Sequence, residues 1–248
     1  MNNEQFDDPC NVSERLRAQA NARGLETAII DPCGLHPSQS KQTRSITFAE
    51  LEADVELLAR GLVARGVQPG QRLALLVPPS IEMITLVFAL LRSGAVAILI
   101  DPGMGKKNLV RCLSEAQPTG FIAIERAQWV RRILRHKFPL AKLNVTVGAP
   151  LLFAGFTLNQ LRELGKAVSP TSDMGGRGRS AAEDPETSES SKPEIQLPTT
   201  HAHDPAAIIF TSGSTGPAKG VLYRHRNFDA QVELIQKQYH IQPGEIDV

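Results

Sequence analysis

The stretch RLALLVPPSIEMITLVFALLRSGAVAILIDPG, residues 72–103, decides the fold. Its first apolar run, residues 72–77, has the length of a strand, and Ser80 can cap a helix whose apolar residues recur at helical spacing. Gly94 ends that helix, and residues 95–100 form an uninterrupted apolar run, which is typical of a strand buried on both faces. The stretch therefore predicts two strands joined by a helix and short turns, which is the unit of a parallel sheet.

The same alternation continues on both sides of this stretch. Thr47 and Glu50 fit a capping box at the start of a helix that Gly66 closes. The other predicted elements are helices at residues 12–23, 106–116 and 128–138 and strands at residues 27–30, 121–124 and 143–147. We therefore expect an α/β fold in which parallel strands are covered by helices.

The composition is that of an ordinary soluble globular protein. Of the 248 residues, 42% are apolar and 21% are charged, and the formal net charge is +1, so the chain as a whole is not directed to nucleic acid or to an anionic membrane. The most apolar stretch, residues 81–100, is interrupted by Glu82, Arg92 and Gly94, so no membrane span is expected.

Cysteine usage and the first residues predict a cytoplasmic location. Cys10, Cys33 and Cys112 are far apart and lack metal-ligand spacing, which favours free thiols in a reducing compartment. Residues 1–9 contain three acidic residues and no apolar run, so no signal peptide is predicted.

A change in composition divides the chain into three parts. Residues 166–204 are rich in Ser, Pro, Gly, Glu and Thr and have few large apolar side chains, so disorder is predicted there. We expect an N-terminal α/β subdomain at residues 1–165, a disordered insertion or linker at residues 166–204, and the start of an incomplete second subdomain at residues 205–248. An insertion is favoured over a linker because the strand at residues 206–210 needs a sheet to join.

The segment TSGSTGPAKG, residues 211–220, directly follows that strand and has the composition of a polyphosphate cradle. Its glycines let the backbone approach an anion closely through positive φ angles, its hydroxyl residues and amides can converge on phosphate oxygens, and its lysine supplies a positive charge. The predicted ATP phosphate-binding residues are Thr211, Ser212, Gly213, Ser214, Thr215, Gly216, Lys219 and Gly220. A helix capped by Asn227 is predicted to follow.

Two other interpretations of this segment are weaker. A Walker loop requires Gly before the lysine and Ser or Thr after it, whereas Ala218 and Gly220 flank Lys219. A mobile Ser/Gly linker is not expected between an apolar strand and a capped helix. An unrelated kinase or NTPase with a Ser/Gly loop is the remaining alternative.

The segment IIFTSGSTGPAKGV, residues 208–221, resembles the signature of the adenylate-forming superfamily, which includes acyl-CoA synthetases, peptide-synthetase adenylation domains and luciferases. Residues 46–80 and 86–103 are similar to the helices and strands that open the large N-terminal domain of that family. The family usually has Pro immediately before the lysine, where this chain has Ala218. Residues 100–124 resemble most the enzymes that adenylate long acyl chains, in particular the β-lactone synthetases of bacterial olefin pathways.

The resemblance implies a two-step reaction with Mg-ATP. A carboxylate, here expected to be a fatty acid, attacks the α-phosphate to give an acyl-adenylate and pyrophosphate, and CoA or the hydroxyl of the substrate itself then displaces AMP. The loop would hold the β- and γ-phosphates and stabilise the leaving group. The family's adenine and ribose motifs, hinge and catalytic lysine lie downstream of this loop, so no catalytic residue is assigned here and the chain is expected to be a fragment. The alternative is a non-catalytic remnant that binds nucleotide or nothing.

Several remaining features favour structural interpretations. His201 and His203 lack a third ligand, so no metal site is predicted. Trp129 is predicted to lie in the core, and His225 follows the loop as it often does in the family. A basic helix face is predicted to be solvated, with an anion site, for CoA phosphates, as the alternative. Its basic residues are Arg126, Arg131, Arg132, Arg135 and Lys137, and its apolar side is Val130, Ile133 and Leu134.

Overall fold

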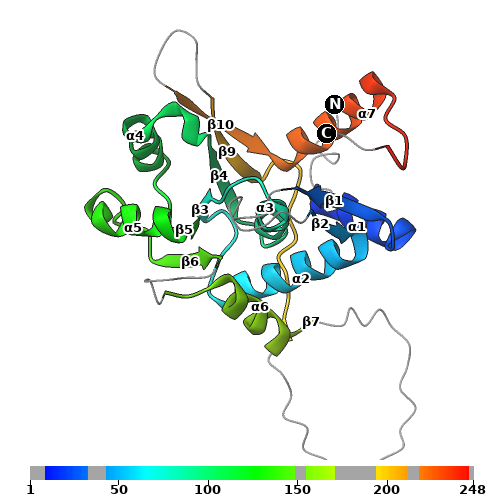
Figure 1. The fold of residues 1–248 in the computed structure, drawn as a ribbon, viewed down its shortest axis with the longest axis horizontal. Coiled ribbons are helices and arrows are strands. Elements are labelled where there is room, and N and C mark those ends of the chain that lie inside the picture. Colours follow the sequence, from blue (N-terminus) through cyan, green and yellow to red (C-terminus); the bar gives the residue numbers. More distant parts are fainter. Residues whose placement is uncertain (1–8, 33–42, 149–154, 171–193, 212–217, 246–248) are drawn as a thin grey trace, which may run out of the picture.

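The computed structural model describes residues 9–32, 43–148, 155–170, 194–211 and 218–245 (Figure 1). Its helices are α1 Ser13–Arg23, α2 Phe48–Ala64, α3 Ile81–Arg92, α4 Lys106–Ala116, α5 Glu125–Ile133, α6 Leu158–Ala167 and α7 His225–Tyr239, with short 3-10 helices η2 Pro102–Met104 and η3 Arg135–Lys137. Its strands are β1 Thr27–Asp31, β2 Arg44–Thr47, β3 Arg72–Leu76, β4 Val96–Ile100, β5 Gly120–Ile124, β6 Leu143–Val147, β7 Ser169–Pro170, β8 Glu194–Ile195, β9 Pro205–Thr211 and β10 Lys219–Arg224. None of these helices combines the length and the apolar character needed to cross a bilayer.

The main sheet has the strand order β10-β9-β4-β3-β5-β6 among the described residues. Strands β9, β4, β3, β5 and β6 run parallel, and β10 pairs antiparallel with β9 at one edge. Ile98 of β4 lies between Ala74 of β3 and Ile208 of β9 in this register. The predicted α/β fold with parallel strands is therefore confirmed.

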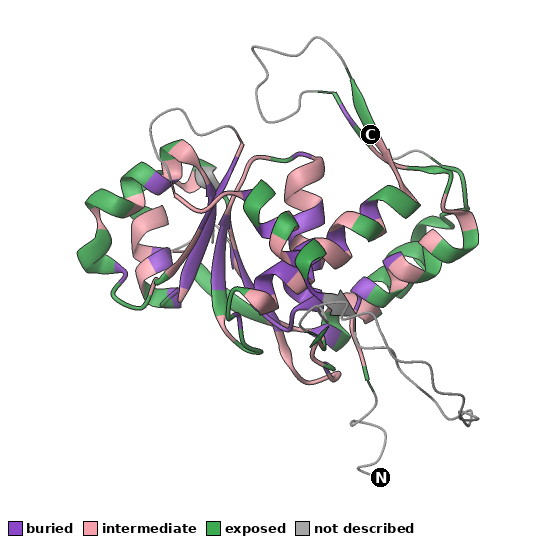
Figure 2. Ribbon diagram, turned by 90° about the horizontal axis from the view of Figure 1, so that it is seen from below, coloured by how far each residue is buried: buried purple, intermediate pink, exposed green. Residues whose placement is uncertain are grey.

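Helices cover both faces of this sheet, because alternate residues of each strand point to opposite faces. Leu73, Leu75 and Ala97 belong to a buried cluster that includes residues of α2, α3 and α6. Ala74, Ile98 and the other residues of the second buried cluster pack with α4 on the opposite face. Figure 2 shows the buried strands running between two groups of helices whose outer surfaces are exposed.

Two predicted helix starts have the expected hydrogen bonds. Thr47 Oγ1 accepts from the backbone N–H of Glu50, and the Glu50 carboxylate accepts from the backbone N–H of Thr47 at 2.9 Å. Ser80 Oγ accepts from the backbone N–H of Met83 at 3.2 Å. These bonds satisfy amide groups that the first turn of each helix leaves without an intrahelical partner.

Several elements in the described residues were not predicted, and three of them extend the packing of the fold. Strand β2 pairs antiparallel with β1, helix α6 packs against α2, and β10 forms a hairpin with β9. Strand β9 lies between β4 and β10, so β10 is an edge strand of the described sheet.

The segment predicted to be disordered has defined structure at both ends. Residues 166 and 167 complete α6, and residues 194–204 contain β8 and the approach to β9, where Thr200 O accepts from the backbone N–H of Cys10 at 2.8 Å. Residues 171–193 lie outside the described residues. The division of the chain into parts at residues 165 and 205 stays a prediction.

Candidate functional site

The predicted phosphate loop is the turn of the β9–β10 hairpin. Lys219 lies directly opposite Thr211 in the strand register, so the two residues mark the base of the loop. Residues 212–217 lie outside the described residues, and the predictions for Ser212, Gly213, Ser214, Thr215 and Gly216 therefore rest on the sequence. Of the predicted site, the structure places the backbone of Thr211 and the residues Lys219 and Gly220.

The loop leaves the sheet at the edge where its parallel strands end. Strand β4, the neighbour of β9, ends at the same edge, and the chain turns there through η2 into α4. Asp101 shapes that turn, because its carboxylate accepts from the backbone N–H of Gly103 at 2.8 Å. Helices α3 and α4 follow neighbouring strands but pack on opposite faces, so the carboxyl ends of β3 and β4 flank a topological switch point, the usual ligand position in α/β sheets.

Lys219 is an exposed cation at the base of the loop. Within the described part of the chain its ammonium group has neither a salt bridge nor a hydrogen bond. Side chains alternate along a strand, so Lys219 lies on the opposite face of the hairpin from Gly220. An uncompensated ammonium group beside a Ser/Gly loop fits an anionic ligand.

Gly220 has a role that differs from the predicted one. We expected its backbone to need a positive φ, but Gly220 is not among the glycines with positive φ. A Cβ atom at this position would lie 3.0 Å from Cζ of Phe210 and 3.1 Å from Cγ2 of Ile208. The glycine therefore leaves room for the Phe210 ring across the hairpin, and the prediction of positive φ is wrong.

Among the described residues, no helix directly follows the loop. Strand β10 carries the chain away for six residues, roughly 20 Å at strand rise, before α7 begins at His225. The amino-terminal dipole of α7 therefore cannot contribute to anion binding at the loop, as the following helix does in a Walker loop. Binding there depends on the amides and hydroxyls of the loop and on Lys219.

The far end of β10 is anchored by polar contacts to residues 201–204. Arg224 Nη1 donates to the carbonyl of His203, and the backbone N–H of His225 donates to the carbonyl of Asp204. Asn227 does not occupy the N-cap as predicted, because α7 begins two residues earlier; its Oδ1 accepts from the backbone N–H of Arg224 at 2.8 Å.

His225 is fully buried at the start of α7, and neither ring nitrogen has a hydrogen-bond partner in the described structure. Burial lowers the pKa of His225, although the charge of Asp204 acts in the opposite direction. His201 and His203 lie nearby, but in the described ranges no cluster of three His, Cys, Asp or Glu residues could hold a metal ion. His225 is therefore best explained as a neutral ring that packs the hairpin against α7.

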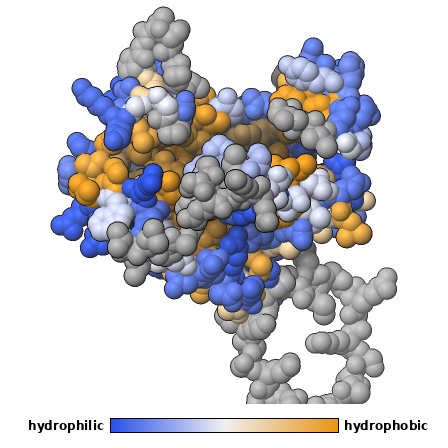
Figure 3. Space-filling view, viewed as in Figure 1, coloured by the Kyte–Doolittle hydropathy of each residue, from blue (hydrophilic) through white to orange (hydrophobic). Residues whose placement is uncertain are grey.

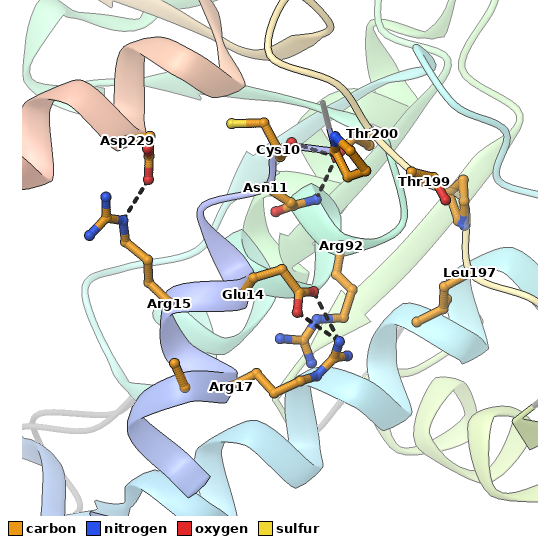
Figure 4. A pocket seen from close by; sticks show the side chains of 13 residues that line it. Cys10, Asn11, Glu14, Arg15, Arg17, Arg92, Leu197, Thr199, Thr200 and Asp229 are labelled. Carbon is orange, nitrogen blue, oxygen red and sulfur yellow. Dashed lines mark hydrogen bonds and ion pairs between the residues drawn. The ribbon is translucent and has the colours of Figure 1, made fainter. Parts of the chain in front are cut away.

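A cleft of about 570 Å³ lies apart from the loop, between α1, residues 197–200 and α7 (Figure 4). Its charged side chains neutralise one another. Arg15 Nε lies 2.5 Å from Asp229 Oδ1, and Arg17 lies 2.8 Å from Glu14. Arg92, whose side chain is 3% exposed, binds Glu52 and the backbone carbonyl of Ser13. The cleft is thus a junction of ion pairs that fastens α7 and residues 197–200 to α1, and we assign no chemistry to it.

The basic helix is placed differently from its prediction. Helix α5 turns Val130 and Ile133 outward, with 52% and 72% exposure, and buries the polar side chain of Gln128. Trp129, predicted to lie in the core, is 40% exposed. Gln128 faces the sheet because its amide donates to the carbonyl of Val145 at 2.9 Å. The prediction of a core Trp129 is wrong. Of the predicted apolar side, Val130 and Ile133 face solvent, whereas Leu134 packs on the α4-side cluster.

Residues 16–247 match the family described as AMP-binding enzyme. The chain is 39% identical over 240 residues to an olefin beta-lactone synthetase of Xanthomonas campestris pv. campestris, an alignment that covers 96% of this chain and 38% of that relative. A long-chain-fatty-acid-CoA ligase from Archaeoglobus fulgidus superposes with a TM-score of 0.71 at 22% identity, over 96% of this chain and 41% of that one. ATP-bound MatB from Rhodopseudomonas palustris superposes with a TM-score of 0.66 at 20% identity, over 95% and 39%. The chain thus spans less than half the length of each of these three proteins.

Proposed function

The chain belongs to the AMP-binding enzyme family, and we propose that it supplies the ATP phosphate-binding part of an enzyme that activates a carboxylic acid as its acyl-adenylate. The observation that carries the proposal is the placement of the loop at residues 211–220. It leaves the carboxyl edge of the parallel sheet, and the uncompensated Lys219 stands at its base. The similar fold of ATP-bound MatB supports a nucleotide ligand.

The proposed first step transfers the adenylyl group. A carboxylate oxygen forms a bond to the α-phosphorus, the bond to the bridging oxygen of the β-phosphate breaks, and pyrophosphate leaves. The negative charge that develops on the leaving oxygens would be met by the loop amides, the loop hydroxyls and Lys219. Mg²⁺ would arrive bound to phosphate oxygens of ATP, because hydroxyl groups and phosphates suit this hard cation and no carboxylate cluster is found in the described residues.

The proposed substrate is a fatty acid, and two second steps are open to its adenylate. The similarity to an olefin beta-lactone synthetase supports a fatty acid with a hydroxyl group on carbon 3; this hydroxyl attacks the acyl carbon of the adenylate, which closes a four-membered lactone and releases AMP. Transfer to the thiol of CoA is the alternative, which the fold of a fatty-acid-CoA ligase supports. Because the chain covers 38% of that synthetase, we propose the full activity for this chain acting together with a region equivalent to the remainder.

The test is exchange of labelled pyrophosphate into ATP. The chain is joined to the remaining region of the Xanthomonas campestris relative, and fatty acids of increasing length are supplied with MgATP. We expect exchange that requires the acid, AMP as the nucleotide product, and a loss of about tenfold or more on Lys219→Ala, which removes a charge-assisted phosphate contact. Lys237→Ala, an exposed lysine on α7, is the matched control and should retain exchange. Exchange without added acid, or ADP as the product, would contradict the proposal.

A further inference from the structure

Positive charge is concentrated in one part of this nearly neutral chain. Residues 102–142 contain nine Lys and Arg residues against two Glu residues, a net charge of +7 in a chain whose formal net charge is +1. These residues include α4, α5 and η3, which lie together at one end of the molecule (Figure 1). The remaining chain therefore carries a net charge of −6.

Several cations at this end form no ion pair with the described residues. Lys106, Lys107, Arg126 and Lys137 have no salt bridge with any described residue, and Arg111 has one long contact, 3.9 Å, with Glu115. Around α1 and α2, by contrast, several arginines form short ion pairs. There the ion-paired arginines Arg17, Arg44, Arg92 and Arg162 are each held against one or more carboxylates at 3.2 Å or less.

These cations border a groove with an apolar floor. A groove of about 710 Å³ runs between α4 and the segment after α5, and Val110 and Leu134 contribute apolar side chains to it. Every charged residue that lines it is cationic, and the four are Lys106, Lys107, Arg111 and Lys137. Leu134 directly follows Ile133, the last residue of α5, so the groove begins where α5 ends.

The outer surface of α5 is apolar where a solvated helix would be polar. Trp129 and Ile133 are separated by four residues and therefore lie on one face of the helix, with Val130 beside them. Hydrogen bonds from Gln128 to the carbonyls of Phe121 and Val145 fix this face outward. Figure 3 shows hydrophobic atoms at the end of the molecule where α5 lies, bordered by hydrophilic ones.

We propose that α5, η3 and the start of α4 form a docking surface for an anionic lipid membrane. Exposed aliphatic and aromatic side chains among Lys and Arg are the pattern of interfacial helices, whose apolar face enters the headgroup region while the cations contact lipid phosphates. A nucleic-acid phosphate backbone has no apolar surface for Val130 and Ile133 to contact. A stable protein interface buries roughly 800 Å² per partner, which three side chains do not supply. The inference is independent of the phosphate loop.

Trp129 provides a direct measurement, because it is the single tryptophan of the chain. The 248-residue chain is mixed with vesicles of phosphatidylcholine alone or of equimolar phosphatidylcholine and phosphatidylglycerol. We expect sedimentation with the anionic vesicles only, a blue shift of the Trp129 emission, and quenching by bromine placed high on the acyl chains. Raised salt should weaken binding, because the headgroup charges are screened.

Matched variants separate this surface from general charge and apolarity. Lys106→Gln with Lys107→Gln should lower the partition coefficient about 25-fold, since each Lys or Arg near an anionic surface contributes a factor of roughly five. Arg226→Gln with Lys237→Gln removes the same charge from α7 and should leave the partition coefficient unchanged. Ile133→Asp should abolish the blue shift, whereas Leu234→Asp, at a position on α7 that is 66% exposed, should preserve it.

Three results would overturn the proposal. The first is equal binding to both vesicle types. The second is sedimentation with vesicles while the Trp129 emission stays unchanged, which would place the contact elsewhere. The third is a chain that does not bind anionic vesicles but dimerises or binds an acidic polypeptide, with Ile133→Asp abolishing that association.

Discussion

Helices α2 and α6 cross so closely that two glycines are required at the contact, and their replacement by alanine makes a sharp test of the fold. A Cβ on Gly61 would lie 2.2 Å from the backbone carbonyl oxygen of Leu161. A Cβ on Gly165 would lie 2.0 Å from the backbone carbonyl oxygen of Leu57. Both obstacles are backbone atoms, so the helices must separate by more than about 1 Å to restore van der Waals contact at about 3.5 Å.

In an ordinary helix, Gly→Ala stabilises a protein by about 1 kcal/mol through helix propensity. Here that gain is opposed by overpacking, typically 1–3 kcal/mol, and by loosened packing of Leu58, Leu62 and Leu161, which are buried at the same contact. We expect Gly61→Ala to lower the free energy of unfolding by about 2 kcal/mol and the melting temperature by roughly 4–8 °C, since each kcal/mol shifts a protein of this size by roughly 2–4 °C. Thermal and urea unfolding followed by circular dichroism measure both quantities.

The double variant makes the reasoning refutable. Once Gly61→Ala has moved the helices apart, Gly165→Ala meets less resistance, so the two free-energy changes should sum to more than that of the double variant. A Gly61→Ala protein as stable as the wild type would show that the helices are not this close. Strict additivity would show that the two glycines do not report on one contact.

Three further predictions concern the junction and the hairpin. Arg92→Met should lower the free energy of unfolding by about 3 kcal/mol in urea, because Glu52 then keeps only Arg17 as partner and Glu56 keeps Arg17 and a longer contact of 3.6 Å with Arg60. A loss below about 1 kcal/mol would be inconsistent with a buried ion pair. Since burial lowers the pKa of His225 below its unfolded value of about 6.5, the stability linked to this group is present above that pH and is lost as the pH falls through the folded pKa. His225→Phe should flatten that dependence, and an unchanged slope of unfolding free energy against pH would contradict the burial of a neutral ring. Gly220→Val should destabilise the hairpin by roughly 1–3 kcal/mol through contact with Phe210, and a rise in melting temperature, as strand propensity alone suggests, would refute this.

Most elements of the central sheet could be predicted because their signals are local. The apolar runs of β3 and β4, the helical spacing of α2 and α3, and the caps at Thr47 and Ser80 depend on neighbouring residues only. Strand β10 lacks such a signal. Its sequence KGVLYR is short and mixed, and it becomes a strand because β9 offers it backbone hydrogen bonds.

The orientation of α5 shows a second limit of the sequence. Periodicity identifies an apolar face, but it does not say whether that face meets the sheet or solvent. The orientation of α5 is fixed by two backbone carbonyls that accept hydrogen bonds from Gln128, and these carbonyls belong to β5 and β6. For the same reason the steric roles of Gly61, Gly165 and Gly220 were not foreseen, because each depends on an atom supplied by a distant part of the chain.

The sequence predicts the chemistry of the candidate site, which stays a prediction, but it did not predict the geometry. The residue types from Thr211 to Gly220 indicated phosphate binding, and the sequence located the preceding strand. The sequence did not reveal that the segment turns a hairpin, or that Lys219 stands opposite Thr211 and far from the start of α7.

The central claim is that the loop at residues 211–220 binds the β- and γ-phosphates of ATP. Isothermal titration of the 248-residue chain with MgATP, pyrophosphate and AMP tests it most directly, with Lys219→Ala and the control Lys237→Ala. We predict that Lys219→Ala weakens ATP and pyrophosphate binding about tenfold or more, leaves AMP binding unchanged, and that the control matches the wild type. Equal affinity of the wild type and Lys219→Ala for pyrophosphate, or an equal loss for AMP, would contradict the claim.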